Sequence, residues 1–254
     1  MSQYAKANPD GPELQEVLAD AVDETRKEIH MVLRIYDELE QGSDEWLAAR
    51  CGLVTASVVG KLVTPTLKVA DNDTSRGLTL TLAAERITGD VEYVHPSFDM
   101  QRGTDDEPFA RAVYAQHFAP VAEIGFMARN FGGFTIGYSP DGLVGDDGLI
   151  EIKSRKPKEH LKTILAGQPP TENLAQLHTG LLVTGRDWID YVSYSPGLPL
   201  WVKRVYPDTR FFDAIKAATE TFETNVAAVI ANYTEATHGL PITERRVELD
   251  EMEI

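Results

Sequence analysis

The sequence contains a single cysteine, Cys51, among its 254 residues. One cysteine cannot form an internal disulfide, and it excludes a four-cysteine zinc or iron–sulfur site. We expect it to be a small buried apolar residue. Apolar runs long enough to cross a membrane are also missing, and the first ten residues are too polar for a signal peptide. These absences predict a cytoplasmic protein with no membrane partner.

Cations are scarce relative to anions. The 24 Lys and Arg stand against 40 Asp and Glu, and the formal net charge is −16. This total argues against a nucleic-acid partner, because Lys and Arg supply the affinity for phosphate. The distribution of charge matters more than the total, however. The acidic residues gather in the first forty positions and in residues 244–253, whereas one stretch is locally basic and contains Lys153, Arg155, Lys156, Lys158 and Lys162.

Several catalytic patterns are absent. The sequence shows no Ser-His-Asp arrangement, no glycine-rich nucleotide loop and no zinc motif. His117 and His178 lack the spacing of metal ligands, so we interpret both as structural. Nucleophilic serine catalysis and zinc chemistry are therefore not indicated.

The most informative stretch is residues 138–153, which read YSPDGLVGDDGLIEIK. Residues 145–148 form a Gly-Asp-Asp-Gly cluster typical of a turn between two short strands. Residues 149–153 then alternate apolar and charged side chains at strand period, which places Glu151 and Lys153 on one face. If the hairpin folds back on itself, Asp141 at the end of its first arm meets both of them.

Two carboxylates beside an ammonium group suit a divalent cation. Magnesium prefers oxygen ligands and is usually held by one or two carboxylates, here Asp141 and Glu151, to which the Ile152 carbonyl could add a ligand. Lys153 would orient an attacking water or neutralise charge that develops on a phosphate. The alternative is a solvated hairpin with an ordinary Glu–Lys surface pair, which a motif this short leaves open. Because the basic stretch directly follows this hairpin, Arg155 and Lys156 are candidate phosphate contacts.

The chain order predicts an α/β fold in which a mixed sheet is flanked by helices. We expect a helical extension over residues 1–41, a main domain over 42–235 and an acidic tail over 236–254. The apolar spacing from residue 12 to 41 is helical. Further helices are predicted at 43–50, 55–63, 74–88, 99–118 (interrupted near 102–103), 157–165, 171–183 and 208–231, and strands at 121–127, 134–138, 149–153, 188–194 and 200–206.

Two helix starts in this pattern carry possible functional side chains. Arg50 and Ser57 lie near helix termini, where backbone amides bind anions readily, so the pair could hold a phosphate. A helix cap with a surface arginine is the simpler reading of the same residues. Glu107 could be a third metal ligand, but acidic residues at a helix start are also common without one.

Four blocks of the sequence, in the same order, resemble the phage lambda exonuclease and YqaJ-type recombinase nucleases. Together they extend over about residues 42–206, which is far more specific than any single motif. The blocks are residues 42–57 (GSDEW through Arg50 to GLVTAS), Arg102-Gly103 with Glu107, the Ser139–Gly142 segment SPDG followed by Glu151-Ile152-Lys153, and 173–188 (NLAQL to Trp188).

The resemblance implies a restriction-endonuclease-like PD-(D/E)xK fold with a catalytic hairpin. It implies one or two magnesium ions, replaceable by manganese, on Asp141 and Glu151, and a water oriented by Lys153. Glu107 would be the additional carboxylate and Gln176 the polar residue of the following helix. Arg50, Ser57 and Ser139 would hold a 5′-phosphate.

The expected activity is a magnesium-dependent, sequence-nonspecific 5′→3′ exonuclease on linear duplex DNA. Such resection feeds single-strand annealing, so an annealing protein is an expected partner, and the resemblance also implies a trimeric ring. Two alternatives stay open on the residues: an endonuclease of the same fold, and a non-catalytic DNA-binding or adaptor protein. A strand-end phosphate on Arg50, Ser57 and Ser139 would favour the exonuclease, and metal-dependent hydrolysis would exclude the adaptor.

Overall fold

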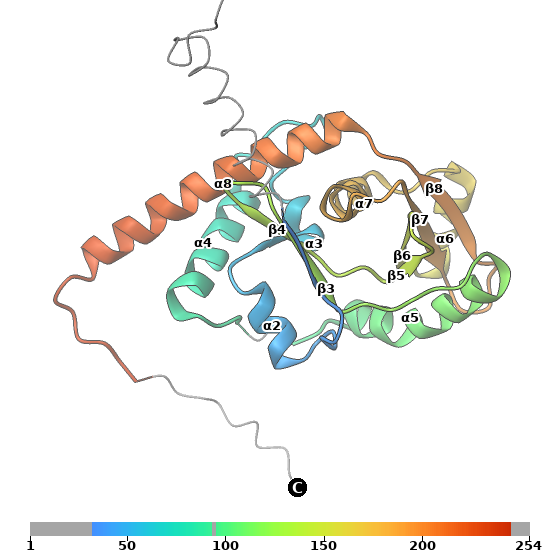
Figure 1. Ribbon diagram of the computed structural model, residues 1–254, viewed down its shortest axis with the longest axis horizontal. Helices are drawn as coiled ribbons and strands as arrows, with labels where there is room; N and C mark the ends of the chain where they lie inside the picture. Colours follow the sequence, from blue (N-terminus) through green and yellow to red (C-terminus); the bar gives the residue numbers. More distant parts are fainter. Residues whose placement is uncertain (1–31, 93–94, 245–254) are drawn as a thin grey trace, which may run out of the picture.

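The computed structural model describes residues 32–92 and 95–244. The predicted helical stripe of residues 12–31 and the end of the predicted acidic tail, residues 245–254, lie outside these ranges. The described residues form a mixed α/β fold in which helices surround two sheets (Figure 1). The predicted architecture, a mixed sheet flanked by helices, is confirmed, although the sequence did not predict a division of the strands into two sheets.

The second sheet in chain order is mixed and carries the β5–β6 hairpin. Its order is β5-β6-β7-β8, with β5 Gly142–Val144, β6 Gly148–Ser154, β7 Trp188–Tyr194 and β8 Trp201–Val205. Strands β5 and β6 are antiparallel, as are β7 and β8, whereas β6 and β7 are parallel. A parallel neighbour needs a long crossover. Here the crossover contains α6 (Pro157–Ala166) and α7 (Thr171–Thr184).

Strand β6 is buried on both faces. On one face Ile150 and Ile152 pack with Ala110 and Tyr114 of α5 (Phe98–His117). On the other, Leu149 joins the larger core that contains residues of α7. The predicted alternation is therefore confirmed, but the face that carries the charged residues is covered as well. Figure 1 shows α5 and α7 on opposite sides of this sheet.

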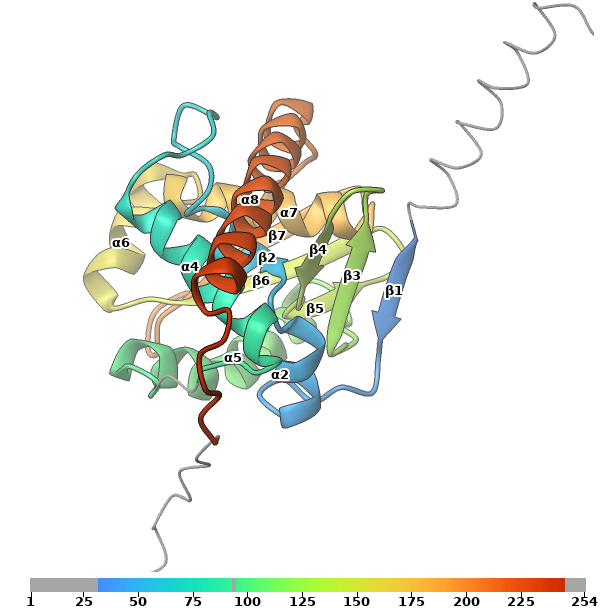
Figure 2. The same ribbon diagram turned by 90° about the vertical axis from the view of Figure 1, so that its left-hand side faces the viewer.

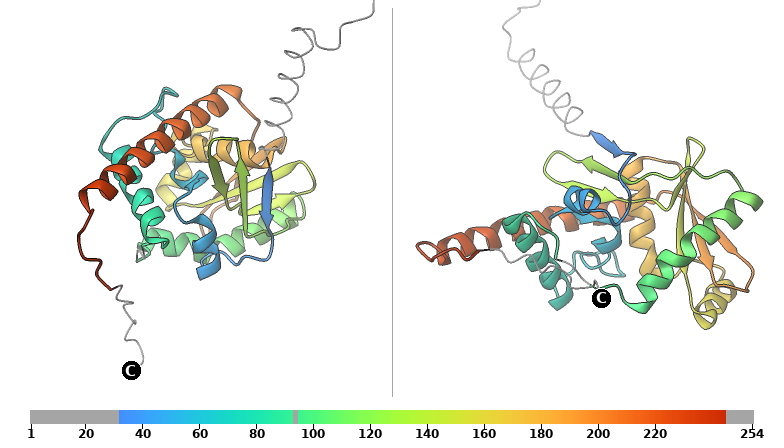
Figure 3. Two further views of the ribbon diagram at one scale, coloured as in Figure 1. Left: turned by 60° about the vertical axis from the view of Figure 1, so that its left-hand side comes forward. Right: turned by 90° about the horizontal axis from the view of Figure 1, so that it is seen from below.

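The first sheet has the order β1-β3-β4-β2 and packs against α7 from the other side. Its strands are β1 Leu33–Tyr36, β2 Val54–Thr55, β3 Phe126–Asn130 and β4 Thr135–Tyr138. Figures 2 and 3 show β1, β3 and β4 side by side. The helix predicted to reach residue 41 is wrong for residues 33–36, because they pair in antiparallel register with residues 126–129 of β3. That pairing lies far along the chain and overrides the local helical spacing.

The other described helices are α2 Asp44–Arg50, α3 Ala56–Val59, α4 Asp73–Thr88 and α8 Thr209–Ala236. The predicted cap of α2 is present: the Ser43 hydroxyl accepts a hydrogen bond from the Trp46 amide at 3.2 Å, a contact worth about 1 kcal/mol. Several boundaries differ from prediction, and α8 extends to Ala236 instead of ending at residue 231. The helix predicted over 55–63 is only four residues long, α5 runs without the expected interruption, and the strand expected from residue 121 begins at Phe126. Helix α8 lies across α4 and α7 (Figure 3).

Candidate active site

The β5–β6 hairpin brings its acidic residues together through its register. Gly142 pairs with Ile150, which places Asp141, just before β5, beside the middle of β6. Asp141 Oδ2 accepts a hydrogen bond from the Ile152 amide at 2.6 Å. A carboxylate held in this way by a backbone donor has a fixed orientation. The sequence prediction that Asp141 meets Glu151 and Lys153 is therefore matched by the geometry.

Glu151 is the most enclosed member of this group. It is only 1% exposed, yet its two oxygens accept hydrogen bonds from three side chains. The Tyr138 hydroxyl donates at 3.0 Å, the Lys153 ammonium at 2.8 Å, and the Gln176 amide also donates. These donors come from β4, β6 and α7, so the carboxylate joins the two sheets and a helix. A buried charge needs such partners, and here it has them.

Glu107 reaches the hairpin from α5. Its carboxylate pairs with Arg111, one helical turn later, and the Arg111 Nε also donates to the Asp141 carbonyl at 2.8 Å. Arg111 therefore ties α5 to the start of β5. Arg111 is a site residue that was not predicted, although its i,i+4 spacing from Glu107 on a predicted helix was a usable signal.

Two carboxylates of this group, Asp141 and Glu107, have raised pKa values. Burial, then the negative charges of Glu151 and Glu107, raises the pKa of Asp141 well above its usual value. Burial also raises the pKa of Glu107, which the Arg111 cation only partly offsets. Burial alone would lower the pKa of Lys153, but Glu151 and Asp141 outweigh it and the pKa is raised, which keeps the ammonium charged. The cluster therefore has more negative charge than its cations neutralise.

A cavity of about 370 Å³ opens onto these side chains and includes the predicted phosphate contacts. Arg50, Ser57 and Ser139 line it together with all five predicted catalytic residues and Ile152. The Trp46 indole donates to the Ser139 hydroxyl at 3.0 Å, and the Arg50 guanidinium stacks over the Trp46 ring at 3.8 Å. Burial lowers the pKa of Arg50, and the negative charge of Glu85 offsets this effect only in part. Trp46 thus positions two of the three predicted phosphate contacts.

Two predicted DNA contacts lie apart from this cavity. Arg155 donates to the Tyr191 hydroxyl at 3.0 Å and to Asn173, so its guanidinium joins β7 to α7. Lys156 is exposed and its ammonium lies 3.0 Å from Asp99. Their predicted contacts with DNA stay predictions, and Arg155 would have to give up its partly buried hydrogen bonds to Tyr191 and Asn173 to make such a contact.

The donor set suits a hard divalent cation. Asp141, Glu151 and Glu107 offer carboxylate oxygens at a cavity with a deficit of positive charge, which is the environment magnesium takes. No three acidic, His or Cys side chains among the described residues converge into a ready-made ligand cage. The reason is visible in the contacts: the Ile152 amide holds one Asp141 oxygen, and protein donors occupy both oxygens of Glu151. Asp141, Glu151 and Glu107 are the residues that would hold a cation, with water and phosphate oxygens as its remaining ligands.

Comparison with known proteins adds the decisive observation. Residues 45–187, more than half of the chain, match the model of the YqaJ-like viral recombinase domain. The chain belongs to the YqaJ-like recombinase family. The matched segment of this YqaJ-like protein begins at α2 and ends just before β7, so it contains every predicted site residue.

Solved structures agree with this assignment. The YqaJ-like protein is 35% identical to an alkaline exonuclease from Laribacter hongkongensis, LHK-Exo, with a TM-score of 0.69 over 78% of this chain and 100% of that one. A second structure of LHK-Exo, in complex with dAMP, matches equally well. A phage-related exonuclease from Haemophilus somnus 129PT, 15% identical with a TM-score of 0.53 over 71% of this chain and 96% of that one, shares the fold. A search of curated proteins gave no match.

Tyr138 is a further site residue of the YqaJ-like protein that sequence reasoning missed. Its ring packs where Gly180 of α7 passes, and a Cβ at Gly180 would lie 2.8 Å from the Tyr138 ring. This close approach holds the hydroxyl against Glu151. The residue belongs to the first sheet, so nothing in the hairpin pattern indicates it.

None of the described helices is both long and apolar enough for a membrane span.

Proposed function

We propose that this chain is a magnesium-dependent nuclease that degrades one strand of linear duplex DNA in the 5′→3′ direction. One observation carries the proposal: a single cavity contains both the Asp141–Glu151–Lys153 group and Arg50, Ser57 and Ser139. The first set suits hydrolysis of a phosphodiester, and the second suits the phosphate at a strand end. Membership of the YqaJ-like family and the likeness to an exonuclease support it.

Each side chain of the site has its own role in the proposed reaction. Asp141, Glu151, Glu107 and the Ile152 carbonyl would hold magnesium, which when bound supplies a Lewis acid and an activated water; manganese could replace it. Lys153, fixed by Glu151 at 2.8 Å, orients the attacking water and offsets charge on the phosphate. Gln176 and Tyr138 hold Glu151 in place from two different elements.

Direction is tested with duplex DNA labelled at one end. We expect magnesium to release the 5′ label as a mononucleotide early and the 3′ label late, and EDTA to stop both. Early release of the 3′ label would reverse the proposed direction. Internal cuts without release from an end would favour the endonuclease alternative, which the hairpin chemistry alone does not exclude.

Arg50→Ala tests the predicted phosphate contact. We expect it to lower the preference for 5′-phosphorylated over 5′-hydroxyl ends by about tenfold, because a charge-assisted contact to a dianionic phosphate is lost. Basal cleavage of hydroxyl ends should fall less. Competition between the two kinds of end measures the preference, with Arg210→Ala, an exposed arginine paired with Asp208, as the control. An unchanged preference would remove Arg50 from the phosphate site.

Partners follow from the proposed reaction. Linear duplex ends are the substrate, and the exposed single strand would pass to a single-strand annealing protein during recombination. The total charge of −16 works against DNA binding over an open surface. A homotrimeric ring, as the family resemblance implies, would keep the duplex beside the cavity despite this charge. Light scattering of the protein in solution measures its mass, and a monomer would contradict the ring.

A further inference from the structure

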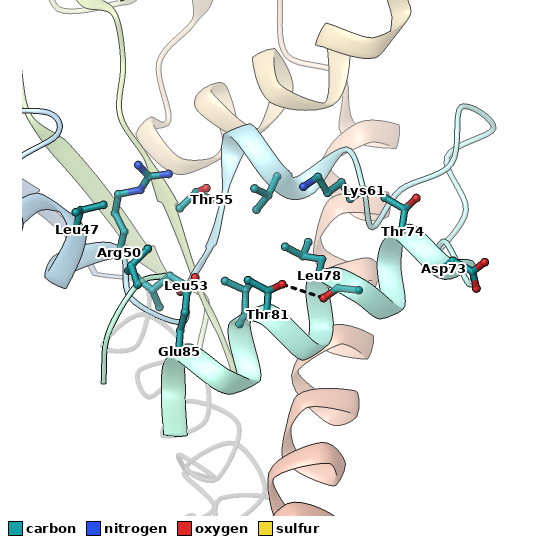
Figure 4. A pocket seen from close by; sticks show the side chains of 14 residues that line it. Leu47, Arg50, Leu53, Thr55, Lys61, Asp73, Thr74, Leu78, Thr81 and Glu85 are labelled. Carbon is teal, nitrogen blue, oxygen red and sulfur yellow. Dashed lines mark hydrogen bonds between the residues drawn. The ribbon is translucent and has the colours of Figure 1, made fainter. Parts of the chain in front are cut away.

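A second cavity lies on the far side of Arg50 from the catalytic carboxylates. It has a volume of about 430 Å³, within the size range of ligand pockets. Arg50 and Thr55 line both cavities. Figure 4 shows α4 along one wall, with Arg50 at one end and Lys61 nearer the other. Apolar side chains and threonine hydroxyls complete the lining, among them Leu47, Leu53, Leu78, Thr74 and Thr81.

Arg50 and Lys61 give this second cavity a cationic group toward each end, beside an apolar wall. Among the described residues, neither Arg50 nor Lys61 forms an ion pair, whereas the two acids of the lining already have partners. Asp73 pairs with Arg76 at 2.8 Å, and Glu85 accepts a hydrogen bond from the Gly52 amide at 2.7 Å. Two unpaired cations beside an apolar wall match a nucleoside with one adjoining phosphate.

We propose that the second cavity accepts one extra nucleoside at the 5′ end of the degraded strand. This inference rests on the proposed function. Arg50 forms the shared wall, so it can hold either of two phosphates. On a phosphorylated end it holds the terminal phosphate and the second cavity stays unused. On a hydroxyl end it holds the first internucleotide phosphate, and the terminal nucleoside enters the second cavity.

The register of cleavage then depends on the chemistry of the end. In both cases water attacks the phosphorus next to the carboxylates, the bond from phosphorus to the 3′ oxygen breaks, and that oxygen takes a proton. A phosphorylated end therefore releases a mononucleotide. A hydroxyl end first releases a dinucleoside monophosphate, and the shortened strand then has a 5′-phosphate and continues by mononucleotides. A phosphodiester has less charge than a terminal phosphate, so the first cut on a hydroxyl end is slower.

Gly77→Leu is a suitable variant to fill the second cavity. Gly77 lies within α4 and lines the cavity, and a Cβ built on it meets no atom within 4 Å. Its backbone is helical, where Leu is favoured over Gly, so the variant should fold. Ala84→Leu is the matched control, because Ala84 is exposed on the same helix and is not part of the lining.

The test follows the first product from duplexes with 5′-hydroxyl and 5′-phosphate ends that are labelled in both of the first two nucleotides. We expect a dinucleoside monophosphate from the hydroxyl end of the wild type and of Ala84→Leu. Gly77→Leu should lower that product about tenfold and leave mononucleotide release from phosphorylated ends within about twofold. A mononucleoside as the first product, or a dinucleotide unaffected by Gly77→Leu, would overturn the inference. Failure to digest phosphorylated ends would instead refute the proposed function.

Discussion

Lys153→Met is expected to reduce hydrolysis of 5′-phosphorylated duplex DNA by about a thousandfold or more. The Lys153 ammonium donates to Glu151 at 2.8 Å, and among the described residues Lys153 is the lysine that lines the cavity beside the carboxylates. Methionine keeps most of the length of the side chain and removes the charge. Orientation of the water and neutralisation of the phosphate are then lost together.

The fold should survive this change. Glu151 keeps two donors, from Tyr138 and Gln176, and Lys153 is 27% exposed, so little apolar packing depends on it. We expect DNA binding in the presence of calcium to change less than about twofold, because one contact among several is lost. Lys162→Met is the control, because Lys162 is exposed and pairs with Glu159. This substitution removes the same charge at a position outside the cavity. Normal hydrolysis by Lys153→Met would show that the site is assigned wrongly.

Glu151→Gln should also reduce hydrolysis by about a thousandfold, but with a cost in stability. The carboxylate accepts from three side-chain donors and is almost fully enclosed. A glutamine amide offers only one oxygen, so its nitrogen must face a donor. We expect unfolding to require about 2 kcal/mol less free energy, the cost of losing hydrogen bonds to a charged group.

Urea unfolding and a magnesium titration separate the two effects of Glu151→Gln. The loss of activity should persist where the variant is fully folded, and the apparent magnesium affinity should fall. Glu123→Gln is the matched control, because this substitution removes the same charge. Glu123 also pairs with Arg111, but its side chain is 72% exposed. If Glu151→Gln remained active at ordinary magnesium concentrations, Glu151 would not be a ligand.

The local part of the site was predictable from the sequence, and the long-range part was not. Asp141, Glu151 and Lys153 sit on one hairpin, so turn residues and strand alternation were enough to bring them together. Tyr138 escaped prediction because it approaches Glu151 from the other sheet. The predicted use of Arg155 on DNA rested on a basic run, whereas the structure shows its guanidinium hydrogen-bonded to Tyr191 and Asn173.

In the fold as well, elements set by local signals were predicted and elements set by long-range pairing were not. Helices α4, α6 and α7 begin and end within two residues of the predicted limits, because their caps and apolar spacing are local signals. Strand β1 was predicted as helix, because its local spacing is helical and its partner β3 lies ninety residues or more away in the sequence. The register of β6 against β7 likewise depends on the crossover, which the pattern of either strand alone does not specify.

The central claim is that one cavity hydrolyses DNA from a strand end. Its most direct test is magnesium-dependent digestion of three duplexes: one linear with 5′-phosphates, one linear with 5′-hydroxyls, and one closed circle. We expect rapid release of mononucleotides from the phosphorylated duplex, slower digestion of the hydroxyl form and an intact circle. Cleavage of the circle would contradict the end-directed account, and no hydrolysis of any duplex would leave a protein that binds DNA without cutting it.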